Sequence, residues 1–193
     1  MTRRRVLLGG LVAMAALVGG CASAQRPAAR RAERAVDWVP LRQGAGWSYD
    51  TQTGIGGDAV LATLSVVRAE GGGRFLVRSS NVRTETWEHR ADGVVREGRY
   101  ILRDPVREGT RWQGPTGESV IASVAPRREV AGQTYRDVVE VVHTARESGI
   151  VTRTWFAAGV GVVEIVAGAS SSRGTTVQVH STLRGYSLGD EAE

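Results

Sequence analysis

The chain has 193 residues, enough for one domain with a sizeable core once an export signal is removed. All 25 basic residues are arginine and the pI is near 10.3, but seven of the arginines precede residue 36. From residue 36 onward, 18 arginines nearly balance 19 acids, which argues against the basic footprint that nucleic-acid binding needs. With one cysteine, Cys21, the chain forms no internal disulfide.

Residues 1–20 have the layout of a secretory signal peptide. Arg3, Arg4 and Arg5 precede an uncharged run over 6–18, and small residues follow. This run of 13 residues is shorter than the roughly 20 that span a membrane as a helix. The start also resembles a twin-arginine export signal, so both that route and the general secretory route stay open.

The signal ends in Val18-Gly19-Gly20-Cys21, which resembles the lipobox of bacterial lipoproteins. In that family a diacylglycerol is attached to the cysteine sulfur and the chain is cut just before it. The resemblance implies a Cys21 that carries acyl chains such as palmitate and anchors the protein in a membrane. Ala22 stands where an aspartate would retain a lipoprotein in the inner membrane, which implies the outer membrane, facing the periplasm, in a cell with two membranes. The alternative is an ordinary signal with an unmodified cysteine.

Residues 21–35 are rich in alanine and arginine and are expected to form a tether between membrane and domain. Its arginines either contact anionic headgroups or remain solvated. A short helix over 28–35 would be marginal on its own.

Residues 36–187 alternate β-branched segments with glycine-rich turns and keep no long helical period. Trp38–Leu41 is expected to pack against the domain, and the acidic tail over 188–193 is expected to fray. The pattern predicts about ten strands, drawn from segments near 46–49, 58–68, 74–80, 84–89, 94–97, 100–103, 109–112, 119–125, 135–145, 150–156, 162–166 and 175–184.

Two hairpins are clearest, one around Asp92-Gly93 and one around Gly159 and Gly161. Many short strands joined by turns indicate an all-β fold with a single antiparallel meander. Such a meander is expected to form a strongly curved sheet or incomplete barrel.

The segment WFAAGVGVVE over 155–164 resembles a C-terminal hairpin of bacterial exported β-proteins of the TapB type. Residues 131–138 (AGQTYRDV) resemble the segment before the central strand of that group. Ala158 departs from it, since a proline is usual there. The resemblance spans Trp38 to Leu183 and implies export and a β fold; most members have no known function.

Four tryptophans are candidates for a ligand face or for core packing: Trp47, Trp87, Trp112 and Trp155. His89, His143 and His180 lack metal-ligand spacing and are interpreted as polar positions on strand faces. Gly185-Tyr186-Ser187-Leu188-Gly189 matches a hydrolase nucleophile pattern, but no histidine follows it.

These observations predict a lipid-anchored envelope protein with a structural or protein-interaction role, no catalysis, no cofactor and no nucleic-acid partner. The alternative is a carrier or chaperone that holds an apolar, lipid-like ligand on the concave face of the sheet. A roomy cavity of at least about 300 Å³ would favour the carrier. Polar groups that converge with perturbed pKa values would favour an enzyme.

Overall fold

The computed structural model describes residues 33–54, 56–80, 83–171 and 174–189. Cys21, the signal and most of the tether lie outside these residues. The described elements are α1 Ala35–Trp38, β1 Gly46–Thr53, β2 Val60–Gly71, β3 Arg74–Ser79, β4 Thr84–Arg90, β5 Gly93–Arg96, β6 Arg99–Arg103, β7 Arg111–Gly114, β8 Gly117–Val130, β9 Gln133–Ala145, β10 Ile150–Ala157, β11 Gly161–Ser171 and β12 Gly174–Ser187. Within the described ranges no helix is long and apolar enough to cross a membrane.

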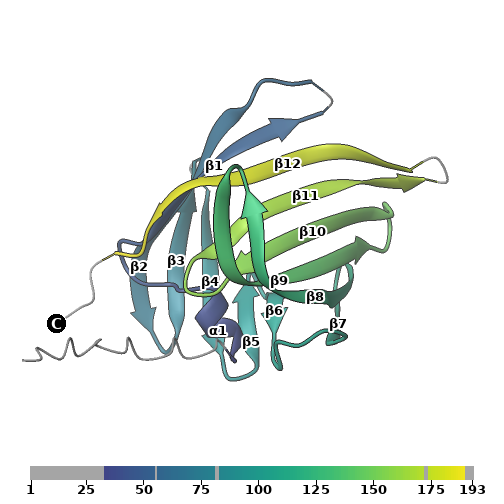
Figure 1. Cartoon of the computed structure of the whole chain (residues 1–193). Helices are drawn as coiled ribbons and strands as arrows, with labels where there is room; N and C mark the ends of the chain where they lie inside the picture. The colour runs from purple at the N-terminus through teal and green to yellow at the C-terminus, as the bar shows by residue number, and fades with distance from the viewer. Residues whose placement is uncertain (1–32, 55, 81–82, 172–173, 190–193) are drawn as a thin grey trace, which may run out of the picture. The chain divides into compact units, whose positions relative to one another are not determined.

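All twelve strands belong to one antiparallel sheet in the order β6-β5-β4-β3-β2-β1-β12-β11-β10-β9-β8-β7 (Figure 1). Each strand pairs with its neighbours in sequence except at one place, between β6 and β7. The prediction of an all-β antiparallel meander with a curved sheet is confirmed, with twelve strands rather than about ten.

The two edge strands meet at a seam without a backbone ladder. The indole N–H of Trp112 in β7 donates to the carbonyl of Tyr100 in β6 at 3.2 Å. Trp112 is 4% exposed, so this hydrogen bond crosses the seam from inside the fold. The sheet is therefore an incomplete barrel whose edges are joined by a side chain.

The segment before β1 closes one end of the curved sheet. Trp38 and Val39 are buried, as the sequence predicted, and α1 packs against β5. His89 of β4 donates from Nε2 to the Val39 carbonyl at 2.8 Å, and the Gly159 N–H donates to the Asp37 carbonyl at 2.8 Å. Because these bonds reach opposite sides of the sheet, the segment acts as a plug.

The β8–β9 hairpin is longer than predicted. The sequence indicated strands over 119–125 and 135–145, whereas β8 runs through Pro126 to Val130 and turns at Ala131-Gly132. Proline is tolerated there because β7 pairs only with the first four residues of β8, which leaves the rest of that strand as an edge.

The distal half of this hairpin folds onto the outer face of the sheet, and Figure 1 shows it in front of β11 and β12. Arg128 of β8 donates to Glu164 of β11 at 2.6 Å. Its guanidinium also lies 4.0 Å from the centroid of the Trp155 ring. The outer face of β10 and β11 is therefore covered by the chain itself.

Candidate functional site

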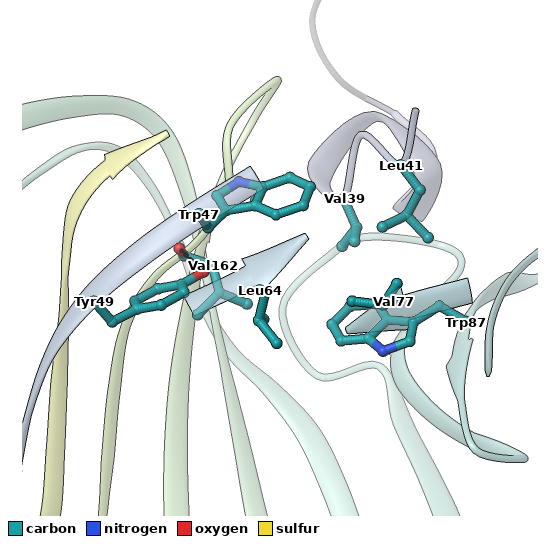
Figure 2. A pocket seen from close by; sticks show the side chains of 9 residues that line it. Val39, Leu41, Trp47, Tyr49, Leu64, Val77, Trp87 and Val162 are labelled. Atoms are coloured by element: carbon teal, nitrogen blue, oxygen red, sulfur yellow. Dashed lines mark hydrogen bonds between the residues drawn. The ribbon is translucent and has the colours of Figure 1, made fainter. Parts of the chain in front are cut away.

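The plugged end of the interior is almost completely filled. A void of about 20 Å³ remains between the plug and the sheet, large enough for one water at most. Figure 2 shows its side chains pointing toward one another; they are Val39, Leu41, Trp47, Tyr49, Leu64, Val77, Trp87 and Val162, together with Gly161. The lining is apolar, so this void is a packing defect and not a ligand site.

Two aromatic residues of β1 hold the plugged end together. Trp47 donates its indole N–H to the Val160 carbonyl at 2.7 Å, and the Tyr49 hydroxyl donates to the Val162 carbonyl at 3.1 Å. Burial raises the pKa of Tyr49. A Cβ at Gly161, whose φ is +108°, would lie 3.1 Å from the Trp47 indole nitrogen. The glycine therefore leaves the space that the tryptophan fills.

A second cavity, of about 370 Å³, lies farther from the plug. Its lining comes from both arms of the sheet, β4–β6 on one side and β8–β11 on the other, so the curvature of the sheet creates it. Its lining residues are Trp87, Arg96, Arg99, Tyr100, Ile101, Thr116, Ser119, Val141, His143, Thr152, Thr154, Phe156, Val162 and Ile165. Trp87 and Val162 line both spaces and separate the cavity from the plugged end.

The cavity changes from polar to apolar along its strands. In β10 its lining runs from Thr152 through Thr154 to Phe156. In β9, His143 lies opposite Thr152 and Val141 lies opposite Thr154. Phe156 and Val141 are buried, whereas Arg99 and Thr116 at the other end are exposed. The cavity therefore has a polar mouth and an apolar floor toward the plug.

His143 is the centre of the polar mouth. Its Nδ1 is hydrogen-bonded to the Ser119 hydroxyl at 3.0 Å, and its Nε2 to the Thr116 hydroxyl at 3.4 Å. Burial, followed by the positive charge of Arg99, lowers the pKa of His143. The imidazole is therefore neutral at pH 7 and presents one donor and one acceptor nitrogen.

The charged lining of the cavity is entirely basic, because the lining residues include Arg96 and Arg99 but no carboxylate. Arg96 is committed to the buried Glu85, to which it donates from Nε at 2.7 Å and from Nη2 at 3.0 Å. This pair lowers the pKa of Glu85. Arg99 has no ion pair with any carboxylate in the described part of the chain, so its charge is available to a ligand.

The Ser119–His143 pair has a simpler explanation than nucleophilic catalysis. The two residues are directly opposite each other in the β8–β9 ladder, where side-chain hydrogen bonds between strands are common. Ser119 is also opposite Trp112 of β7, so its strand is paired on both sides. The ladder therefore accounts for the Ser119–His143 contact, and Thr116 contacts the other nitrogen of the ring.

The structure places the four candidate tryptophans in different parts of the core. Trp47 lies at the plugged end, Trp87 between the two spaces, Trp112 at the seam and Trp155 under Arg128 on the outer face. All four are core residues, and Trp87 alone among them lines the large cavity.

Sequence reasoning missed the polar mouth. Its residues come from the start of β6, the β7–β8 turn, β8, β9 and β10, and no local motif joins them. The available signal was the step from polar to apolar residues at alternate positions, as in Thr152, Thr154 and Phe156. Its meaning depends on which strands face each other across the interior.

The other sequence candidates lie on strands. His89 holds the plug, and His180 of β12 is bonded to Glu164 at 2.9 Å on the outer face. Ser187 of the hydrolase-like pattern is an exposed residue at the end of β12. Within the described ranges, no group of three or more His, Cys, Asp or Glu residues is placed to hold a metal ion.

No protein-family model and no curated protein matches this chain. Among solved structures, it is similar to a protein from Bacteroides fragilis described as exported and as having a YmcC-like fold. That similarity has a TM-score of 0.43 and 10% identity, and covers 77% of this chain and 98% of that chain. It is also similar to a protein from Parabacteroides distasonis described as a lipoprotein, with a TM-score of 0.39, 9% identity and coverage of 78% and 98%.

Proposed function

We propose that this protein is anchored in the cell envelope through a lipidated Cys21 and binds a small amphipathic molecule inside its curved sheet. The observation that carries the binding function is the cavity of about 370 Å³ with a polar mouth and a buried apolar floor. This volume lies in the range of about 300–1,000 Å³ typical of small-molecule sites.

The cavity favours the carrier over a purely structural role. The same sheet packs almost without voids at the plugged end, so its side chains are able to fill an interior of this curvature. A structural scaffold gains stability from a filled interior. The open part is instead left unfilled, and three threonines and a histidine line it. This lining also changes the expected ligand from a wholly apolar molecule to one with a polar end.

The location is proposed from the sequence. The lipobox resemblance at Val18–Cys21 and the basic tether support an exported lipoprotein, and Ala22 supports the outer membrane with the domain in the periplasm. Labelled palmitate should be incorporated into the wild-type chain and not into Cys21→Ala. Equal labelling of the two would contradict the anchor.

The binding function is tested by filling the cavity. Thr154 lines it, so Thr154→Phe should abolish binding of decanol and decanoate in titration calorimetry of the full chain carrying Cys21→Ala. Thr176→Phe, at an exposed position of β12, is the matched control and should bind as the parent does. Binding that survives Thr154→Phe unchanged would place the ligand elsewhere.

The proposed role is binding without turnover, and the Ser119–His143 pair allows a direct check. p-Nitrophenyl decanoate should be hydrolysed no faster by the parent than by Ser119→Ala. Saturable hydrolysis that is lost in Ser119→Ala would show an enzyme instead.

A further inference from the structure

The charge of the mouth defines the ligand more closely than its volume does. We propose that the cavity selects a single-chain amphiphile with an anionic head, with Arg99, His143 and Thr116 around the head and the apolar chain on Phe156 and Val162. This inference rests on the proposed binding function and adds the sign of the head and the number of chains.

The sign follows from the lining. Arg96, the other charged residue of the lining, is paired with the buried Glu85 through two hydrogen bonds, so that pair is close to neutral. Arg99 then adds one positive charge with no carboxylate partner in the described part of the chain. A cationic head would face this charge without a counter-ion, whereas a carboxylate or phosphate accepts charge-assisted hydrogen bonds from it.

The uncharged polar groups of the mouth also suit an anionic head. Thr116 and Ser119 carry hydroxyl donors, and both already contact the His143 ring. Because a hydroxyl hydrogen rotates to suit its partner, these groups can turn toward an anion oxygen without moving the strands. Arg99 and Thr116 are exposed, so the head would remain partly hydrated at the mouth.

The number of acyl chains in the ligand follows from the volume of the cavity and the shape of its floor. A space of about 370 Å³ equals about twelve water molecules at their liquid volume, which suits one short acyl chain better than the two long chains of a phospholipid. Trp87 and Val162 close the floor against the plug, so the large cavity does not continue into the small void at the plugged end.

The test compares probes that share one chain. Decanoate, decyl phosphate, decanol and decylammonium are titrated into the full chain carrying Cys21→Ala at low ionic strength. The two anions should bind at least about tenfold more tightly than decanol, and decylammonium should bind most weakly. The tighter anion tells whether the natural head is a carboxylate or a phosphate. Added salt should weaken the binding of the two anions and leave the binding of decanol unchanged.

Arg99→Gln should lower the affinity for decanoate about tenfold and leave that for decanol unchanged, whereas Arg99→Lys should retain most of the preference. Arg136→Gln, at an exposed position on the distal part of β9, is the matched control and should change neither affinity. Equal binding of all four probes, abolished by Thr154→Phe, would overturn the charge selection and leave the binding function intact. Binding of none of the four would overturn both.

Discussion

The two ends of the interior belong to one sheet and pack in opposite ways. At the plugged end, aromatic and aliphatic residues leave only about 20 Å³. At the other end, where threonine, serine, histidine and arginine line the mouth, about 370 Å³ stays open. Since a folded protein gains stability by filling its interior, we infer that the plugged end holds the fold together, and the difference supports the proposal that the open end serves binding.

The largest effect is expected at the plugged end. Trp47→Ala removes a buried indole and its hydrogen bond to Val160, and should lower the free energy of unfolding by about 3–5 kcal/mol in urea titration. A loss below about 1 kcal/mol would show that this end is not the structural core.

A matched pair of smaller changes compares the ends directly. Val77 lines the plugged end and Val141 the open cavity, and both are buried on strands. Val77→Ala should lower the free energy of unfolding in urea titration by about 2 kcal/mol, and Val141→Ala should lower it by about 1 kcal/mol. The second loss is smaller because Val141 already faces empty volume and has fewer contacts to lose. Equal costs would mean that the open cavity is packed as tightly as the plugged end.

The smallest effect is on the pH dependence of stability. Burial lowers the pKa of His89 below 6.5 and outweighs the hydrogen bond to the Val39 carbonyl, which acts to raise it. The unfolded chain therefore binds a proton more readily, and the stability that His89 contributes is lost as pH falls below about 6.5. The melting temperature should fall between about pH 7 and pH 5.

His89→Gln keeps a donor and should reduce that fall in melting temperature. The pKa of His143 is also lowered, so part of the dependence should persist in this variant. An unchanged pH profile in His89→Gln would show that protonation of His89 is not linked to unfolding.

The sequence predicted the fold well because strand and turn signals are local. The Asp92-Gly93 turn, the Gly159–Gly161 hairpin and the short strands between them follow from alternation and backbone preference within a few residues. Pro126 concealed the length of β8, since proline breaks a strand unless one side of that strand is unpaired. Whether that side of β8 is unpaired depends on the short length of β7, which is a property of the tertiary structure.

The site could not be predicted in the same way. Arg99, Thr116 and His143 meet only because the sheet curves until its edges join at Trp112. Their size makes the tryptophans candidates for the interior, yet Trp155 lies on the outer face of β10, where Arg128 of the distal β8–β9 hairpin covers it. Alternation along each strand shows two faces, but the identity of the inner face depends on the direction of curvature.

The proposed amphiphile lies inside the sheet with its head at the mouth. Intermolecular nuclear Overhauser effects between decanoate and the full chain carrying Cys21→Ala test this most directly. The account predicts contacts from the terminal methyl group of decanoate to Phe156 and Val162, and from the methylene next to its carboxylate to Thr116 and His143. Contacts to the outer face alone, or the reverse orientation of the chain, would contradict it.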